Sequence, residues 1–211
     1  MLMRTLFSTL VAVTLSAVPS AAAVPSPSNS SLPACMALCP FGDMPFTVVV
    51  RDFANNPILG STVVLDFSIC PQAFLCPSGF GTPYPYVVDL TSRTLRAVTD
   101  AGGSITFPAH VGGTGPPGSV RVFADGVMLR TYALASPDQD GDGFVVSIIG
   151  ADDPTFAAKL GTSDPTADFD CDGDVDFDDQ SIFGFHHSQS CDAYVDAVRP
   201  ITWGALKLHY R

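Results

Sequence analysis

Hydrophobic and polar residues alternate in short runs along much of the chain, a pattern that predicts half-buried β-strands. The runs are rich in β-branched and aromatic residues, and turn-forming Gly, Pro, Asn and Asp separate them. The strongest hairpin signal is Asp125-Gly126, because a type I′ turn needs a positive φ at both central residues. Seven such runs predict an antiparallel β-sandwich over residues 41–135. The predicted strands cover residues 46–52, 61–67, 86–90, 94–99, 104–107, 120–123 and 128–134.

The chain after the sandwich predicts short helices rather than strands. One predicted helix covers residues 154–160, with Asp153 as its N-cap and a proline at its first position. A second begins at Asp178 or Asp179 and runs toward His187. The fold class predicted for the chain is therefore a mainly β N-terminal sandwich followed by a small α module.

The charge of the chain is uneven. Every acid is Asp, and the formal net charge of −11 argues against nucleic acid or an anionic membrane as a partner. Residues 24–135 hold six Asp and five Arg, whereas residues 136–198 hold fifteen Asp and only Lys159 as a cation. Like charges so crowded repel one another unless a cation neutralises them. The sequence therefore predicts two modules, and the second one needs cations.

The N-terminus has the order of residues that is typical of an export signal. Arg4 precedes an apolar run at residues 6–18, and small residues follow it, so residues 1–23 are predicted as a signal peptide. A retained membrane anchor is the alternative, but the run is short for one. Residues 24–40 are predicted as a flexible Pro/Ser-rich leader. The basic and aromatic tail, residues 199–211, is either a final strand or a recognition tag.

Six cysteines in an exported chain favour disulfides, and a zinc site is the alternative, although the sequence has no Cys-x-x-Cys motif. Cys171 and Cys191 are expected to pair because that half of the chain has no other cysteine. The remaining four are expected to pair among themselves, in a pattern that the sequence does not determine: Cys35, Cys39, Cys70 and Cys76.

Alternating aspartates near the end of the chain have the spacing of a calcium loop. Asp168, Asp170 and Asp172 occupy positions 1, 3 and 5, where their oxygens can converge on one hard cation. A glycine at position 6 permits the sharp turn, and Asp179 at position 12 closes the coordination sphere. Calcium fits better than magnesium because it accepts many oxygens in a flexible geometry. Val175 at position 8 is expected to turn inward and pair with a second loop.

A second copy of this spacing begins 30 residues earlier, with Asp138, Asp140 and Asp142 at positions 1, 3 and 5. Ile149 stands at position 12, and the acids return at Asp152-Asp153, which implies about three inserted residues. The later loop is therefore expected to bind calcium more strongly than this one. The alternative is that the Asp-rich stretch is only solvated surface.

The first module resembles bacterial immunoglobulin-like domains of the invasin/intimin type over about residues 44–135. The resemblance is carried by VVVRDFANNPILGSTVVLDF and the later VTDAGGSITF, which match a strand–turn–strand with a central Asn-Pro and a following hairpin. It implies a sandwich used as a spacer or adhesive module, without catalytic residues.

The second module resembles the dockerin family over about residues 137–191, because two loop–helix units follow each other and position 12 is Asp. Dockerins bind cohesins through exposed helix faces, often with a Ser-Thr pair, to which Ser181 and Thr155 are the nearest equivalents. The resemblance implies two calcium ions. The implied ligands of the stronger site are Asp168, Asp170, Asp172, the Asp174 carbonyl, Asp176 through water, and Asp179. Those of the other site are Asp138, Asp140, Asp142, the Phe144 carbonyl, and Asp152 or Asp153.

No nucleophile–base motif of the Gly-x-Ser-x-Gly or His-Glu-x-x-His kind occurs in the sequence, and its four histidines are only a weak indication of a metal site or a catalytic base. The sequence therefore predicts an exported, non-catalytic calcium-binding attachment protein. Its expected partner is a cohesin-like or other cell-surface protein, and a glycan is a further candidate ligand. The alternatives are an accessory component or fragment of a polysaccharide-degrading enzyme, and a glycan-binding sandwich in which calcium is purely structural.

Overall fold

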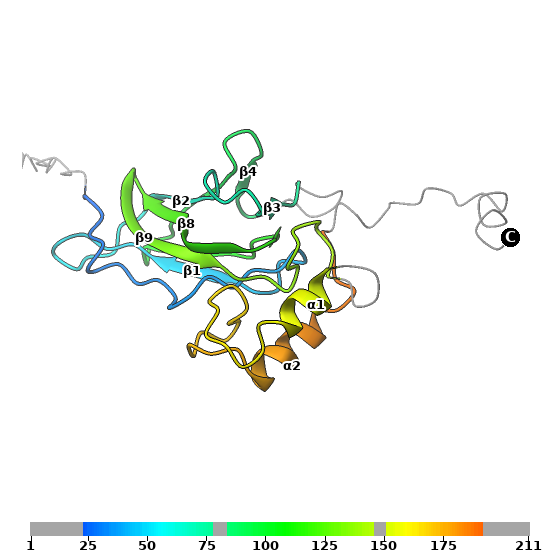
Figure 1. The fold of residues 1–211 in the computed structure, drawn as a ribbon. Helices are drawn as coiled ribbons and strands as arrows, with labels where there is room; N and C mark the ends of the chain where they lie inside the picture. Colours follow the sequence, from blue (N-terminus) through cyan, green and yellow to red (C-terminus); the bar gives the residue numbers. More distant parts are fainter. Residues whose placement is uncertain (1–22, 78–83, 146–150, 192–211) are drawn as a thin grey trace, which may run out of the picture.

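The structure is a computed structural model that describes residues 23–77, 84–145 and 151–191. The predicted signal peptide, apart from Ala23, and the predicted tail lie outside these residues. Within them the fold is mainly β, with antiparallel sheets and two short helices beside them (Figure 1). Neither of these helices has the length and apolar character needed to cross a membrane.

The larger sheet is antiparallel, with the strand order β4-β5-β2-β8-β9. In the central strand β2, Val63 lies opposite Ala97 of β5 and Ala124 of β8, and all three side chains are buried. The alternation of polar and apolar residues in the sequence thus gives the sheet one buried face and one face exposed to solvent. The strands are β2 (Thr62–Asp66), β4 (Val87–Asp89), β5 (Thr94–Val98), β8 (Gly115–Ala124) and β9 (Val127–Leu134).

A second, smaller sheet pairs β1 (Phe46–Val49) with β6 (Ser104–Phe107). Its buried side chains share one hydrophobic core with those of the larger sheet. At this core the ring of Phe46 meets that of Tyr132 edge-on, with centroids 5.5 Å apart. All seven predicted strands are present, and the two antiparallel layers are consistent with the predicted sandwich.

The β8–β9 hairpin confirms the predicted turn, since Asp125 and Gly126 have φ of 46° and 81°. Strand β8 nevertheless begins five residues earlier than predicted. Gly115 pairs with Leu134, and an irregularity between Gly115 and Val120 absorbs the residues between them.

Two short strands were not predicted, β3 (Phe74–Leu75) and β7 (Val111–Gly112), which pair with each other. Each has only two residues, too few for an alternation to show in the sequence. Both lie outside the seven predicted strands.

Residues 24–40 pack against the sandwich, so the prediction of a flexible leader is wrong for this segment. Ser31 exchanges backbone hydrogen bonds with Val49 of β1, 2.9 Å in each direction. Met36 and Leu38 are buried in the core. The segment is held because it satisfies an otherwise unpaired edge of the smaller sheet and adds apolar side chains to the interior.

The helices are α1 (Asp152–Ala157) and α2 (Phe177–Phe185), and both begin earlier than predicted. Asp153 lies inside the first turn of α1, and the N-cap position, Ala151, has no side-chain cap. Helix α2 is capped by Asp176, whose Oδ1 accepts from the N–H of Asp178 at 2.7 Å. The carboxylate of Asp179 accepts in return from the N–H of Asp176 at 2.9 Å, which completes a capping box.

Two disulfides cross from the sandwich side of the chain to the loop–helix side. They join Cys35 to Cys171 and Cys76 to Cys191. The predicted Cys171–Cys191 bond is therefore wrong, and so is the expectation that the earlier cysteines pair among themselves. The structure leaves the buried Cys39 and Cys70 as thiols.

Candidate metal centre

Residues 168–179 fold so that three carboxylates converge. Oxygen atoms of Asp168, Asp170 and Asp179 all lie within 4.8 Å of one another. Asp179 is 0% and Asp168 7% exposed, whereas Asp170 is exposed on the rim. Burying two carboxylates side by side is costly unless a cation or hydrogen-bond donors compensate them.

Backbone N–H groups hold the two buried carboxylates in place. Asp168 accepts from Cys171 at 2.7 Å through Oδ1 and from Gly173 at 3.1 Å through Oδ2. Asp179 Oδ1 accepts from the N–H of Phe169 at 2.6 Å. Cys171 and Gly173 both adopt a positive φ, 68° and 102°, so the chain coils tightly around the carboxylate of Asp168.

Residues 138–145 and Asp152 repeat this arrangement. Asp138 accepts from Gly141 at 2.7 Å through Oδ1 and from Gly143 at 2.9 Å through Oδ2, and these glycines have φ of 75° and 89°. Asp152 Oδ1 accepts from the N–H of Gln139 at 2.6 Å. Asp138, Asp140 and Asp152 bring oxygens within 4.8 Å of one another. Asp152 thus occupies the place that Asp179 has in the other loop.

The remaining candidate ligands lie apart from these two groups. Asp153 contacts His187, with 3.1 Å between Oδ1 and Nε2, and therefore does not join the first cluster. Asp172 lies with Asp174 and Asp176 in a separate exposed group rather than with Asp168. The exposed side chain of Asp142 accepts from the N–H of Phe144 at 2.9 Å, and Ile149 lies outside the described residues.

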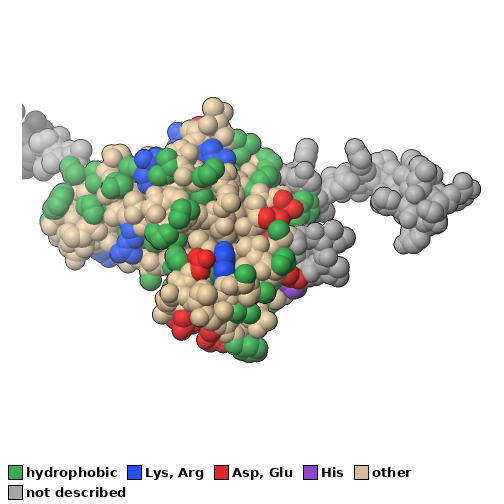
Figure 2. All heavy atoms as spheres, viewed as in Figure 1, with side chains coloured by type: hydrophobic (Ala, Val, Ile, Leu, Met, Phe, Trp, Pro, Cys, Tyr) green, Lys and Arg blue, Asp and Glu red, His purple; other side chains and the backbone are tan. Residues whose placement is uncertain are grey.

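Electrostatic repulsion is strong in both loops. Burial raises the pKa of Asp138 to about 7, against the opposing hydrogen bonds from Gly143 and Gly141, and the charges of Asp152 and Asp142 raise it further. The pKa of Asp174 is raised mainly by the charge of Asp172. In Figure 2, acidic side chains form several groups, at the right and over the lower part of the molecule, whereas most Lys and Arg side chains lie over the sheets. A cation among these carboxylates would remove the repulsion.

The two loop–helix units are paired crosswise. Val175, at position 8 of the later loop, exchanges 2.8 Å backbone hydrogen bonds with Gly161 and Thr162, which follow α1. Val145, at position 8 of the earlier loop, does the same with Ser188 and Gln189, which follow α2, at 2.7 and 2.8 Å. The expectation that Val175 pairs with the other loop is therefore wrong. Each loop instead forms backbone hydrogen bonds with the residues that follow the helix of the other unit.

Aromatic stacking fills the space between these units. The rings of Phe156 in α1 and Phe183 in α2 stack with centroids 4.5 Å apart and an interplanar angle of 4°. Phe169 of the later loop stacks on Phe156 at 5.6 Å. This small core fixes the distance between the two carboxylate clusters.

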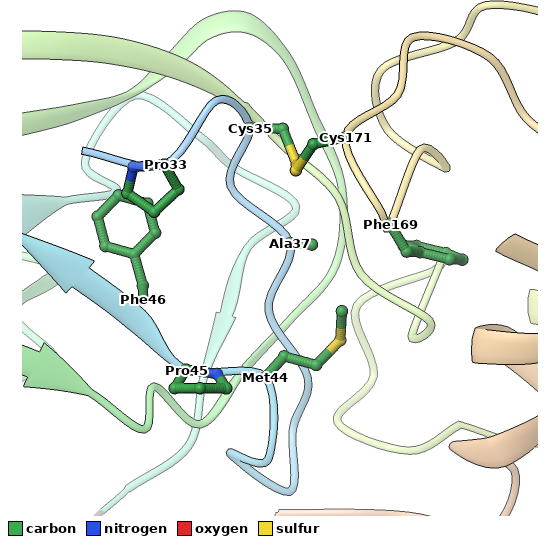
Figure 3. A pocket seen from close by; sticks show the side chains of 8 residues that line it. All are labelled: Pro33, Cys35, Ala37, Met44, Pro45, Phe46, Phe169 and Cys171. Carbon is green, nitrogen blue, oxygen red and sulfur yellow. A yellow bond between two sulfur atoms is a disulfide. The ribbon is translucent and has the colours of Figure 1, made fainter. Parts of the chain in front are cut away.

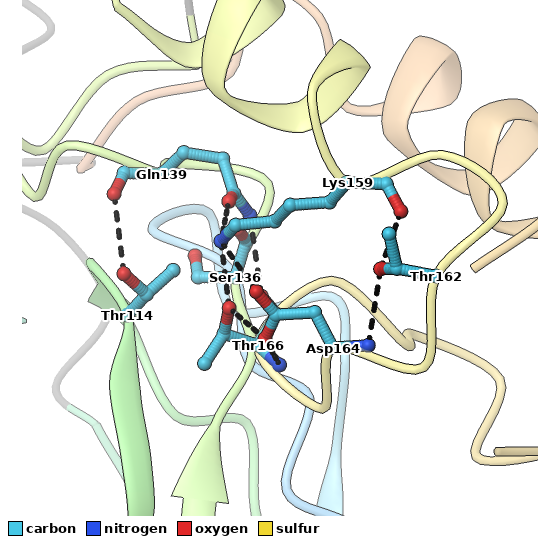
Figure 4. A network of polar contacts seen from close by, with 7 residues as sticks. All are labelled: Thr114, Ser136, Gln139, Lys159, Thr162, Asp164 and Thr166. Carbon is cyan, nitrogen blue, oxygen red and sulfur yellow. Dashed lines mark hydrogen bonds and ion pairs between the residues drawn. The ribbon is translucent and has the colours of Figure 1, made fainter. Parts of the chain in front are cut away.

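Lys159 anchors the earlier loop from inside the molecule. Its Nζ donates to Gln139 Oε1 and Thr166 Oγ1, each at 2.6 Å, and lies 3.9 Å from Asp164 (Figure 4). Burial lowers the pKa of Lys159, while the charge of Asp164 opposes this shift. The sequence marks Lys159 as an isolated cation but carries no signal for these partners.

A cavity of about 230 Å³ lies where the sandwich meets the loops. Figure 3 shows Met44 from the sandwich side and Phe169 from the loop side facing it, next to the Cys35–Cys171 disulfide. The lining is apolar apart from the disulfide and backbone, so this cavity offers no candidate metal ligands.

The chain matches no protein-family model, no curated protein and no solved structure. The assignment of the site therefore depends on the geometry and charge of the two loops.

Proposed function

We propose that this chain is an exported, non-catalytic calcium-binding attachment protein, with an immunoglobulin-like sandwich and a dockerin-like calcium module. The observation that carries the proposal is the repeated hydrogen-bond scheme of the two loops. In each loop the first Asp accepts from positions 4 and 6, and the last Asp accepts from position 2. Solvated acidic surface gives no reason for two buried carboxylates to meet twice in the same way.

Calcium is the cation that this arrangement favours. Both clusters offer only carboxylate and backbone oxygens, which are the ligands of a hard cation. In the proposal, one ion binds at Asp168, Asp170 and Asp179, and a second at Asp138, Asp140 and Asp152. Calcium at 100 times its dissociation constant would stabilise the folded chain by about 2.7 kcal/mol per site.

Export is supported by the covalent structure. Two disulfides persist in oxidising compartments and are rare in a reducing cytosol. Together with the apolar N-terminal run, they favour a secreted or cell-surface location.

Attachment is supported by the exposed surface of α2. Phe177 and Phe185 stand at the two ends of this helix and are 73% and 76% exposed. The same helix also lines a groove of about 290 Å³ toward α1, through Gln180 and Gly184. Exposed aromatic side chains are typical anchors of protein interfaces. We therefore favour a protein partner, cohesin-like or another cell-surface protein, over a glycan.

Calcium titration of the full oxidised chain after chelation tests the metal proposal. We expect two ions per chain, measured by calorimetry. Asp179→Asn should remove one of them, because the amide has lost the charge. Its one oxygen can still accept the hydrogen bond from Phe169, although the capping bond from Asp176 is lost.

The neighbouring Asp178→Asn is the matched control, because Asp178 is exposed and belongs to neither cluster. It should leave the stoichiometry at two. A wild-type chain that takes up no calcium, or two variants with equal affinities, would show that these carboxylates are ordinary surface charges.

Retention of the tagged chain on intact producing cells tests the attachment proposal. Phe177→Ser with Phe185→Ser should abolish calcium-dependent retention while leaving calcium stoichiometry unchanged. Phe53→Ser is the control, since Phe53 is 72% exposed in a turn of the sandwich. Undiminished retention of the double variant would refute docking through α2.

A further inference from the structure

Four side chains from distant parts of the sequence meet where the sandwich contacts the end of α2. Cys39 and Asp43 come from the segment before β1, and His186 and Gln189 come from the end of α2 and the residues after it. Gln189 Oε1 lies 3.1 Å from Cys39 Sγ and 2.7 Å from His186 Nδ1. Asp43 lies 3.4 Å from His186 Nδ1 through Oδ1 and accepts from Gln189 Nε2 at 2.9 Å.

This group differs in chemistry from the aspartate loops. Thiolate, imidazole and carboxylate are the three ligand types that zinc takes in proteins, whereas calcium takes oxygen alone. One ligand atom from each of Cys39, Asp43 and His186 lies within 4.8 Å of the other two. Cys39 is 0% and His186 5% exposed, and Asp43 lies at the more exposed side of the group. A metal here would be shielded from water on the sulfur and imidazole side.

One separation already has the length of a tetrahedral edge. With Zn–S of about 2.3 Å and Zn–N or Zn–O of about 2.0–2.1 Å, ligand atoms of a tetrahedron lie roughly 3.3–3.6 Å apart. The 3.4 Å between Asp43 and His186 lies in this range, whereas the 3.1 Å between Cys39 Sγ and Gln189 Oε1 is shorter and would lengthen around an ion. The 2.7 Å between Gln189 and His186 is a hydrogen bond that would lengthen around an ion.

The other buried thiol, Cys70, has different neighbours from Cys39. Cys70 Sγ contacts the carbonyl of Thr114 at 3.6 Å, and no histidine or carboxylate groups with it among the described residues. Burial raises the pKa of the Cys39 thiol, so Cys39 can donate a hydrogen bond to Gln189 when no metal is bound. A metal would displace that proton.

We propose that Cys39, Asp43 and His186 form a zinc-binding site, with the Gln189 amide oxygen nearest to the fourth position. This site is separate from the proposed calcium loops and does not depend on them. Because two ligands come from each side of the contact, the ion would clamp the end of α2 to the sandwich beside the Cys76–Cys191 disulfide. Its role would be structural, as in closed zinc sites with no open position.

The test uses the full oxidised chain with calcium in excess, so that the aspartate loops do not compete for zinc. We expect one zinc ion per chain by calorimetry. Cobalt substituted for zinc should show the charge-transfer absorption of a bound thiolate. Cys39→Ser and His186→Gln each remove a ligand. Each should therefore weaken zinc binding by more than the roughly 10- to 100-fold that is typical when a residue behind a ligand is changed.

Matched controls are available for both ligand types. Cys70→Ser removes the other buried thiol, and His187→Gln removes the neighbouring histidine that contacts Asp153 instead. Both should bind zinc as the wild type does. If Cys39→Ser fails to fold, the cobalt spectrum of the wild type still decides whether a thiolate binds. The proposal would be overturned by absence of zinc uptake, by a cobalt spectrum without the thiolate band, or by equal losses of affinity in variants and controls. The four side chains would then be a hydrogen-bonded contact between the sandwich and α2 without a metal.

Discussion

Aspartate has two different roles in this chain, and burial separates them. In the sandwich, Asp52 and Asp89 sit at exposed turns, where backbone N–H groups of Asn56 and Ser92 lower their pKa. Asp138 accepts backbone N–H groups in the same manner, yet its pKa is raised because it is buried and faces other carboxylates. The same side chain is therefore a turn former in one half and a candidate metal ligand in the other.

Asp66 provides a test of pH dependence at a single residue. Burial raises its pKa, but hydrogen bonds from Ser68 and the ion pair with Arg121, 2.6 Å from Oδ2, outweigh burial, and the pKa of Asp66 lies below its usual value. Because the folded-state pKa is lowered, its contribution to stability is present above the unfolded pKa of about 4 and is lost as the pH falls through the folded pKa.

Asp66→Asn should lower the free energy of unfolding at pH 7 by about 1.5–3 kcal/mol, the range for hydrogen bonds to charged groups. The difference from the wild type should shrink below about pH 4, where the Asp66 carboxyl of the unfolded wild type begins to bind a proton while that of the folded chain is still ionised. Urea unfolding at several pH values measures both. A difference that stays constant down to pH 2 would mean that the charge of Asp66 contributes nothing.

Elements with a local signal could be predicted, and those formed by distant contacts could not. The alternation that predicts β2 or β5 is contained within each strand, as is the Asp125-Gly126 turn. Strands β3 and β7 exist only because they meet each other, so neither leaves a pattern in its own sequence. Both helices begin earlier than the sequence predicts, because the first residue of a helix depends on which carboxylate reaches which backbone N–H. Asp176, which caps α2, is an example.

The hairpin turn gives a prediction at the scale of an element. Gly126 has φ of 81°, and a Cβ there would meet no atom within 4 Å, so Gly126→Ala introduces backbone strain without a clash. It should lower the free energy of unfolding by roughly 1–2 kcal/mol. Gly184→Ala in α2 is the control, since that glycine is also uncrowded but has no positive φ.

Gly184→Ala should raise the free energy of unfolding by up to about 1 kcal/mol, because Ala has a higher helix propensity than Gly. Chemical denaturation of the oxidised chain measures both effects. Equal effects of the two substitutions would mean that the turn conformation does not restrict the residue at position 126.

For the whole molecule, the sequence predicts two modules from charge, yet the structure joins them. The spacing of the aspartates predicts that positions 1, 3 and 12 of the later loop converge, but it wrongly adds Asp172, and Asp142 in the earlier loop. Only the geometry distinguishes Asp152 from Asp153. The sequence carries no signal for Cys39 meeting His186 or for Cys35 meeting Cys171, because such pairs depend on how the two halves pack. Contacts of this kind determine both the disulfides and the proposed zinc site.

The last prediction concerns communication between the two halves. The disulfides join cysteines that are 136 and 115 residues apart in the sequence. In the chain-entropy model, each bond raises the free energy of the unfolded state by about 5 kcal/mol because it reduces the conformational entropy of that state. A loop–helix half that loses calcium therefore cannot separate from the sandwich while both bonds are intact. Chelation should then raise hydrogen exchange in β2 and β8 as well as in the aspartate loops.

Replacing Cys35, Cys171, Cys76 and Cys191 by Ala should confine the effect of chelation to the two aspartate loops and their helices, residues 138–145 and 151–191. The matched control is Cys70→Ser, which removes a thiol and leaves both disulfides in place. Hydrogen exchange read by mass spectrometry resolves the sheets from the loops in all three chains. If the sandwich amides of the oxidised chain do not respond to chelation, the halves are independent despite their covalent links. If they respond equally without the disulfides, packing alone couples them.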